Sequence, residues 1–433
     1  MKKNCAFTIC ATNYIGLAKV LERSIRSHYQ EVDFYIIVAD EPGESLVNSL
    51  EDNVIIAKDA LNSTYSEEKW NDMAFKYDLT EFCTAIKPAS IKYLFEKGYE
   101  KCIYFDPDIF VFSSISGIYE SLDKYEAIVT PHITQIHLAE KGNIREQQLL
   151  CSGVYNLGFL GLRNTNRTNN FICWWLNKLK DKCFASIPEN LFTDQKWVDL
   201  LPSFMGNQLC VSMDMGLNMA PWNFHERMIC EKNADLYVGC REEGMPQLSK
   251  LIFVHFSGYN YKALLNGDVV QRNIRDMSSY DDLRVLFRIY KENLELSHID
   301  NYISHPYTYG TFDNGCLISK EVRRLYRAYS EAHGYQDNPF SRESSFYSRA
   351  KRMRLINETN ENRISKVYND DILNKKKYRA ICLVNSILKC VCFLFGYRKY
   401  SLLYKMANFY GTIENHYFLV SSKNLRYKIR ESF

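Results

Sequence analysis

The sequence predicts an α/β protein with a largely parallel sheet. Residues 5–11 and 33–39 read as buried strands, and residues 16–28 between them carry apolar side chains at helical spacing. A third short strand is expected at 53–56 and a further helix at 84–97. Strands that alternate with helices favour a parallel sheet with helices on both faces.

Composition and missing motifs exclude several classes of protein. A chain of 433 residues with 46% hydrophobic and 24% charged residues is ordinary for a globular protein with a large core. No glycine-rich phosphate loop follows the first strand, which disfavours a dinucleotide oxidoreductase or a P-loop ATPase. The fourteen cysteines include no C-x-x-C pair, and Met1 leads directly into a strand-like run. These features predict reduced thiols in a cytosolic protein, without a zinc or disulfide framework.

Two carboxylates interrupt an apolar stretch at residues 101–112, which read K-C-I-Y-F-D-P-D-I-F-V-F. Alternation along a strand places Asp106 and Asp108 on the same side of the chain. Pro107 between them cannot donate to a sheet ladder, so the pair is expected at the exposed end of the strand. Carboxylates this close repel each other unless a cation lies between them, and a hard divalent metal ion suits their oxygens. A simple Asp-Pro-Asp turn is the alternative.

Later segments add candidate elements. Residues 171–182 and 192–201 are expected to be helices, the second with Thr193 as its N-cap and Asp194 facing its positive end. A last strand is expected at 251–255. A basic helix is predicted at 318–328 and carries Arg323, Arg324 and Arg327. These arginines are expected either to be solvated or to contact an anionic acceptor.

Five blocks, taken in order, resemble the GT-A glycosyltransferases of family 8, which include glycogenin and bacterial lipopolysaccharide galactosyltransferases. The resemblance spans about residues 4 to 265. The blocks are Thr12-Asn13-Tyr14, Lys87, Tyr104-Phe105-Asp106-Pro107-Asp108, Asn156-Leu157-Gly158 with Asp194-Gln195, and His255-Phe256-Ser257-Gly258 with Lys262. Leu157 stands where the family usually has Ser, and Ala263-Leu264 replace its Pro-Trp.

The resemblance implies a GT-A (Rossmann-like) nucleotide-diphospho-sugar transferase fold with a mixed, mostly parallel sheet. It implies Mn²⁺ or Mg²⁺ bound by Asp106, Asp108 and His255, with Mn²⁺ favoured by the imidazole ligand. The catalytic candidates are Asp194, Gln195 and Asn156. The candidates for binding the donor are Thr12, Asn13, Tyr14, Asp40, Lys87, Asp106, Gly258 and Lys262.

The expected reaction is a retaining transfer of sugar from a UDP-sugar to a glycan or glycolipid acceptor of surface polysaccharide or lipopolysaccharide. Two mechanisms are open. In one, Asp194 acts as a transient nucleophile. In the other, the departing phosphate takes the proton of the acceptor. The alternatives are a nucleotidyltransferase that makes the sugar nucleotide, and an inactive GT-A domain that binds nucleotide or glycan.

The C-terminal part of the chain is basic. From Ser341 onward there are 19 Lys and Arg against 7 Asp and Glu, a net charge of +12. Residues 379–404 contain an apolar stretch with basic flanks, short for a membrane span and typical of an interfacial helix on anionic lipid. A buried helix of a small C-terminal domain is the alternative, and no motif for nucleic-acid binding accompanies the charge.

These features predict three regions and a location. They are a catalytic domain at 1–275, a helical extension packed on it at 276–340, and a basic, largely helical region at 341–433. The expected location is the cytoplasm, at the inner face of the bacterial cytoplasmic membrane.

Overall fold

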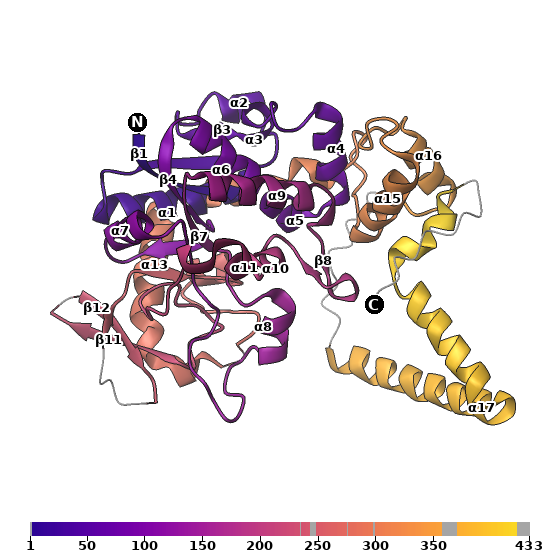
Figure 1. The fold of residues 1–433 in the computed structure, drawn as a ribbon. Coiled ribbons are helices and arrows are strands. Elements are labelled where there is room, and N and C mark those ends of the chain that lie inside the picture. The colour runs from indigo at the N-terminus through magenta and orange to yellow at the C-terminus, as the bar shows by residue number, and fades with distance from the viewer. Residues whose placement is uncertain are drawn as a thin grey trace. The chain divides into compact units, whose positions relative to one another are not determined.

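The structure is a computed structural model that describes residues 2–233, 235–242, 248–274, 276–297, 299–356 and 370–421. The chain forms two compact units (Figure 1). Unit 1 comprises Met1–Met73 and Tyr77–Tyr309, and unit 2 comprises Ala74–Lys76 and Gly310–Phe433. This division at Gly310 differs from the predicted boundaries at 275 and 340.

Unit 1 is built on a seven-stranded sheet in the order β10-β6-β7-β4-β1-β2-β3. Its strands are β1 Lys2–Cys10, β2 Asp33–Val38, β3 Val54–Ile56, β4 Tyr99–Phe105, β6 Ala127–Val129, β7 Phe159–Arg163 and β10 Leu209–Val211. Only β7 runs antiparallel to its neighbours, β4 and β6. The α/β class with a mixed, mostly parallel sheet is therefore confirmed.

The helices of unit 1 bury the faces that the periodicity predicts. Helix α1 (Ile15–His28) packs Leu17, Val20 and Leu21 into the core. The other helices are α2 Glu44–Val47, α3 Ala57–Ala60, α4 Glu67–Lys76, α5 Leu79–Ala85, α6 Lys87–Glu96, α7 Ser116–Lys124, α8 Glu146–Ser152, α9 Asn166–Lys182, α10 Gln195–Val198, α11 Leu201–Met205, α12 Tyr261–Leu265, α13 Arg284–Leu296 and α14 Asp300–Ile303.

The helix predicted at 84–97 corresponds to α6, and its first two residues are the end of a separate helix, α5. Asp78 forms a capping box with Glu81 that starts α5, and α5 ends at Ala85. Pro88 lies in the first turn of α6, where the missing N–H is tolerated. Because proline cannot donate to the turn before it, the chain starts a new helix here, with Lys87 as its first residue.

Small antiparallel sheets complete unit 1. They are β5 (Ile109–Val111) with β14 (Phe253–His255), β11 (Arg227–Lys232) with β12 (Asp235–Cys240) and β13 (Ser249–Lys250), and β8 (Ala185–Ser186) with β9 (Leu191–Phe192). The expected last strand is thus confirmed, but it pairs with β5 outside the main sheet. His255 lies opposite Ile109 in this pair, and that register brings it beside Asp108.

Unit 2 contains α15 (Lys320–His333), α16 (Ser345–Arg352) and α17 (Asp370–Tyr410). Its core gathers aromatic and aliphatic residues, among them Phe312, Tyr326, Phe346 and Tyr417. These large side chains compensate for the small size of the unit, because each removes a large apolar area from water.

The arginines of α15 are buried, so both interpretations of the basic helix are wrong. Arg323, Arg324 and Arg327 are 4%, 6% and 2% exposed. Arg323 donates to the carbonyl oxygens of Ala74 and Phe75. Glu414 lies 3.1 Å from Arg327 and 3.8 Å from Arg324. The arginines therefore tie unit 2 together, and sequence periodicity could not show that buried partners would meet them.

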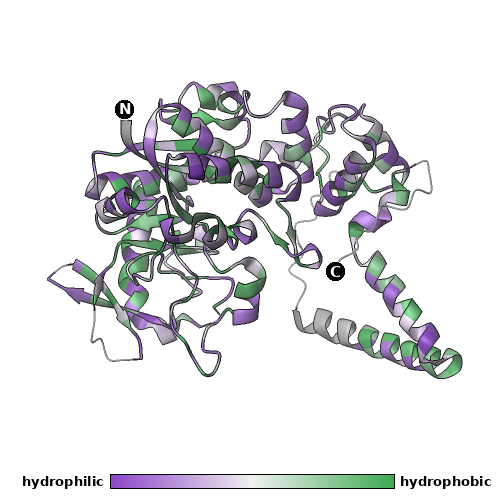
Figure 2. Cartoon of the chain, in the orientation of Figure 1, coloured by the Kyte–Doolittle hydropathy of each residue, from purple (hydrophilic) through white to green (hydrophobic). Residues whose placement is uncertain are grey.

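Helix α17 bends at Gly396, where φ is +77° (Figure 1). Its residues Arg379–Tyr410 are long and apolar enough to cross a membrane by length and composition, and the most apolar part is not buried among the described residues. Figure 2 shows hydrophobic residues along both arms. The alternative of a buried helix in a packed C-terminal domain is therefore wrong.

Candidate functional site

Asp106, Asp108 and His255 come together at the end of β4. The main-sheet strand stops at Phe105, and the two aspartates occupy the turn before β5. The Nε2 atom of His255 lies 3.0 Å from an oxygen of Asp108 and 3.6 Å from an oxygen of Asp106. The three ligand atoms lie within 4.8 Å of one another. Two carboxylates and one imidazole form a donor set that fits Mn²⁺.

The charges of this cluster depend on one another. Burial raises the pKa of Asp106 above its usual value, although the charges of Lys87 and His255 act against this. Burial also acts to raise the pKa of Asp108, but the charge and hydrogen bond of His255 lower it below the usual value. Burial opposes protonation of His255, yet the Asp108 carboxylate raises its pKa. Asp108 and His255 thus shift each other's pKa toward the charged form.

Asn156 fixes the orientation of the His255 ring. Its Oδ1 atom accepts from the backbone N–H of Gly158 at 3.2 Å, and the same atom lies 3.2 Å from Nδ1 of His255. Since Oδ1 can only accept, Nδ1 carries a proton and donates. Nε2 therefore points to the two carboxylates, as a metal-binding histidine requires.

The glycine of the Asn-Leu-Gly block makes room for the same ring. A Cβ atom on Gly158 would lie 2.4 Å from Cε1 of His255 and 2.6 Å from Nδ1. The backbone of Gly158 also accepts a 2.8 Å hydrogen bond from the N–H of Asp106. The absence of a side chain at Gly158 thus lets strand, turn and imidazole approach closely.

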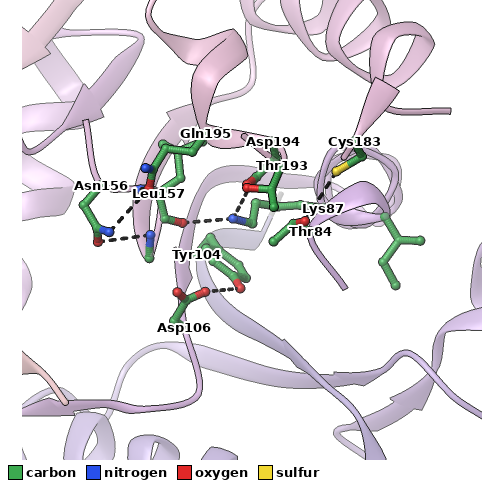
Figure 3. Close-up of polar contacts among 12 residues, drawn as sticks. Thr84, Lys87, Tyr104, Asp106, Asn156, Leu157, Cys183, Thr193, Asp194 and Gln195 are labelled. Atoms are coloured by element: carbon green, nitrogen blue, oxygen red, sulfur yellow. Dashed lines mark hydrogen bonds and ion pairs between the residues drawn. The ribbon is translucent and has the colours of Figure 1, made fainter. Parts of the chain in front are cut away.

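Lys87 and Asp194 form a buried ion pair beside the cluster (Figure 3). The Lys87 ammonium lies 2.5 Å from a carboxylate oxygen of Asp194. It donates to the carbonyl oxygen of Leu157 at 2.9 Å and lies 4.0 Å from the ring centre of Tyr104. The hydroxyl of Tyr104 in turn donates to Asp106 at 2.5 Å. Lys87 thus links Asp194 to the residues that hold the aspartates.

Gln195 uses its whole amide to hold the segment around Asn156. Its Oε1 accepts from the backbone N–H of Leu157 at 3.0 Å and from the Asn156 amide at 3.5 Å. Its Nε2 donates to the carbonyl oxygen of Ser152 at 2.9 Å. The Asp-Gln and Asn-Leu-Gly blocks therefore form one hydrogen-bonded unit.

The prediction for the start of α10 is wrong. Thr193 is not an N-cap, because the helix begins at Gln195 and Thr193 has a left-handed backbone with φ of +47°. Asp194 occupies the N-cap position, but its carboxylate does not cap the helix. The charge of Lys87 holds that carboxylate instead, and this long-range partner cannot be seen in the local sequence.

The first block lies at the end of β1 and is held by Asp40. One carboxylate oxygen of Asp40 accepts from the backbone N–H and the hydroxyl of Thr12, at 2.8 and 2.7 Å. The other accepts from the backbone of Thr308 at 3.3 Å. Asp40 is 1% exposed, so it shapes the loop around Thr12.

The remaining candidates differ in their burial and in their contact with the cluster. Tyr14 packs edge-to-face on Tyr261, whose hydroxyl lies 3.4 Å from Asp108. Asn13 is half-buried. Gly258 has φ of +72°, and a side chain there would press on Gln271 and Arg272. Lys262 is exposed on α12, and no contact with the aspartates is seen among the described residues.

Sequence reasoning missed three polar residues of this site. Asn218 donates to Oδ1 of Asn156 at 3.1 Å and to the hydroxyl of Thr130 at 2.8 Å. Tyr261 contacts Asp108, as described above. The signal for Asn218 is the mixture of polar and apolar side chains at residues 214–223, which is consistent with a pocket wall. Thr130 follows an apolar run and Tyr261 lies between Asn260 and Lys262, and neither pattern points to the site.

The sequence matches no protein-family model and no curated protein. Several solved structures similar to this chain are glycosyltransferases. The galactosyltransferase LgtC, in complex with donor and acceptor sugar analogs, is 12% identical, covers 70% of this chain and 97% of its own, and gives a TM-score of 0.38. GlyE of Streptococcus pneumoniae TIGR4 is 14% identical over 72% of this chain and 67% of its own, with a TM-score of 0.39. The bifunctional glycosyltransferase WbbM is 14% identical over 70% of this chain and 52% of its own, with a TM-score of 0.40.

Proposed function

We propose that the chain is a metal-dependent glycosyltransferase that moves a sugar from a UDP-sugar to a glycan or glycolipid acceptor, with retention of configuration. The observation that carries this proposal is the Asp106, Asp108 and His255 cluster at the end of β4. In open α/β sheets ligands bind beyond the carboxyl ends of the strands, where this cluster lies. The five sequence blocks that resemble family 8 agree with it.

The three side chains of the cluster indicate which metal ion the site binds. Asp106, Asp108 and Nε2 of His255 would hold Mn²⁺ or Mg²⁺. A bound divalent ion there supplies positive charge for a diphosphate leaving group. The Asn156 oxygen keeps the proton of His255 on Nδ1. Tyr104 and Tyr261 hold the two carboxylates in place through their hydroxyls.

The surrounding residues orient the sugar end of the donor. Asp194 is 2% exposed and paired with Lys87, which favours a positioning role over attack on the sugar. Gln195 likewise holds the backbone of Leu157. In this arrangement Lys87 does not contact the diphosphate directly, and its charge acts on the donor through Asp194 and Tyr104. Thr12, Asn13 and Tyr14 line the position for the base.

Calorimetric titration with UDP and with GDP, each with and without Mn²⁺, tests the proposal. We expect UDP to bind only with the metal, and Asp108→Ala to abolish that binding. Asp235→Ala is the matched control, because this half-exposed aspartate pairs with Lys250 and has no contact with the cluster among the described residues. Failure of both nucleotides to bind under any metal would overturn the proposal.

The proposal includes an anionic membrane surface as partner of α17, at the inner face of the cytoplasmic membrane. Exposed apolar side chains lie on both arms, among them Leu383, Phe393, Leu394 and Leu403. The apolar part of the first arm, from Arg379 to Phe395, is roughly 25 Å long at 1.5 Å per residue. A hydrocarbon core is roughly 30 Å thick, which favours a helix lying at the interface.

Flotation with vesicles tests this part separately. We expect the full chain to float with vesicles of phosphatidylglycerol and phosphatidylcholine, and less with phosphatidylcholine alone. The double variant Phe393→Glu/Leu394→Glu should stay in solution. Leu317→Glu, at an exposed leucine outside α17, is the control. Equal flotation of the double variant and the control would remove the membrane from the proposal.

A further inference from the structure

A second cluster of metal-binding side chains lies outside the site described above. His137, His225 and Glu226 each offer one ligand atom, and these atoms lie within 4.8 Å of one another. His137 comes from the segment between β6 and α8, and the other two directly precede β11. Two imidazoles with one carboxylate form a common zinc-binding set.

The two imidazoles have nitrogen atoms without partners. The side chain of His137 is 7% exposed, and its Nε2 atom is buried without a hydrogen bond among the described residues. The Nδ1 atom of His225 is also buried, and it too has no hydrogen-bond partner in the part of the chain that the structure describes. Buried polar atoms are nearly always paired, because leaving one unpaired costs about 1 to 3 kcal/mol. An ion between the rings would satisfy both nitrogens.

The carboxylate of the cluster is fixed in advance. Glu226 is fully buried, and its oxygens accept from the backbone N–H groups of Thr134 and Gln135 at 3.0 and 2.8 Å. The Thr134 hydroxyl donates to it at 3.2 Å. These bonds hold the carboxylate in place. No basic side chain among the described residues forms a direct ion pair with it. Because a buried charge is costly without a counter-charge, this favours a cation nearby.

His137 also has the outer partner typical of a metal-bound histidine. Its Nδ1 atom lies 3.6 Å from a carboxylate oxygen of Glu242, which Lys141 holds by an ion pair. In many metal sites a carboxylate beside one ring nitrogen orients the other nitrogen toward the ion. Glu242 beside Nδ1 would leave Nε2 of His137 for that role.

We propose that His137, His225 and Glu226 bind a divalent transition metal ion of the Zn²⁺ type. Ligand atoms around tetrahedral zinc lie roughly 3.4 Å apart, within the span of the three side chains here. This site is separate from the Asp106 cluster and does not depend on the transferase proposal.

The metal would cross-link a segment that borders the first site. Ile133 and Ile144 pack against a small core that contains Trp222, and the Trp222 ring lies 5.2 Å from that of His255. Between them, Ile136 and Leu138 are fully exposed, so the middle of the segment has little apolar packing of its own. A metal bound through His137 would tie this middle to the start of β11.

Cobalt and zinc titrations of the full chain test the site. The double variant Asp106→Asn/Asp108→Asn serves as background, because it removes the first cluster. We expect one equivalent of Co²⁺ to bind, with visible absorption of a tetrahedral nitrogen and oxygen site and displacement by Zn²⁺. His137→Ala and His225→Ala in this background should abolish that absorption, and His28→Ala, at an exposed histidine, should keep it.

A second measurement needs no substitution in the cluster. Trypsin cleavage after Lys141, followed by mass spectrometry, should slow at least tenfold when Zn²⁺ is added to the background variant. Unchanged cobalt absorption in both histidine variants would overturn the proposal. So would intense sulfur-to-cobalt absorption, because it would assign the metal to cysteines, or cleavage that zinc does not slow.

Discussion

The ammonium of Lys87 lies 2.5 Å from the carboxylate of Asp194, and the two side chains are only 1% and 2% exposed. The pair joins the first residue of α6 to the residue before α10. It lies beside Tyr104 and Leu157, which contact the metal-binding turn and its supporting segment. Its charge balance therefore affects both the stability of unit 1 and the geometry of the site.

We expect Lys87→Met to lower the free energy of unfolding of unit 1 by about 3 kcal/mol, because it leaves the Asp194 carboxylate buried without its cation. The double variant Lys87→Met/Asp194→Asn should lose less than the sum of the single variants. Denaturant unfolding followed by tryptophan fluorescence measures this, since all five tryptophans lie in unit 1. Lys92→Met, on the partly exposed face of the same helix, should change stability by less than about 0.5 kcal/mol. Equal losses at Lys87 and Lys92 would contradict the buried pair.

Asn156 should control metal affinity without binding the metal. We expect Asn156→Leu to weaken Mn²⁺ binding by about 10- to 100-fold, because the His255 ring loses the acceptor for its Nδ1 proton. Electron paramagnetic resonance of free Mn²⁺ measures the affinity. Asn156→Asp keeps an acceptor oxygen and should retain more of the affinity, and Asn170→Leu on α9 is the exposed control. An unchanged affinity in Asn156→Leu would show that the ring is oriented by other contacts.

His132 should make unit 1 less stable in mild acid. Burial lowers the pKa of His132 to about 4, although its hydrogen bond to the Val154 carbonyl acts the other way. Because the unfolded chain binds this proton with a pKa of about 6.5, it takes up more protons than the folded protein between these values. Stability from this group is full above about pH 6.5 and declines as the pH falls toward 4.

Comparison with a variant isolates this effect. Between pH 7 and pH 5 the wild-type protein should lose about 2 kcal/mol more than His132→Asn, whose amide nitrogen takes the place of Nδ1 as donor to Val154 but does not titrate. Tryptophan fluorescence in urea at the two pH values gives both numbers. Parallel pH dependence of the two proteins would mean that the pKa of His132 is not lowered in the folded protein.

Glu414 should contribute to the folding stability of unit 2. We expect Glu414→Ala to destabilise this unit by about 3 kcal/mol, because Arg324 and Arg327 lose a buried anionic partner. Unit 2 contains no tryptophan, so circular dichroism at 222 nm reports the change, and tryptophan fluorescence reports unit 1 separately. Glu343→Ala, at an exposed glutamate, is the control. A circular dichroism transition that coincides for the two variants would contradict the role of Glu414.

The sequence predicted the parts of the fold that depend on local patterns. The alternation of apolar runs with helical periodicity predicted α1 and β2 to within one residue, since buried faces impose a period of two or of 3.6, whereas β1 begins three residues before the predicted start. It also predicted that the main strand breaks between Phe105 and Ile109. It began the helix of α6 three residues early, at the end of α5, because the periodicity continues across Pro88.

Local pattern by itself determined the class of the fold, the position of the acidic turn and the residue types able to bind a metal. Tertiary structure decided which distant side chains meet there. The register of β14 on β5 brings His255 to Asp108, and Lys87 binds the Asp194 carboxylate, which the sequence was expected to direct at the positive end of a helix. It also buries the arginines of α15, which the sequence left at the surface. The physical reason is that backbone periodicity depends on neighbouring residues, whereas a buried charge is stable only with a partner that the fold supplies from elsewhere.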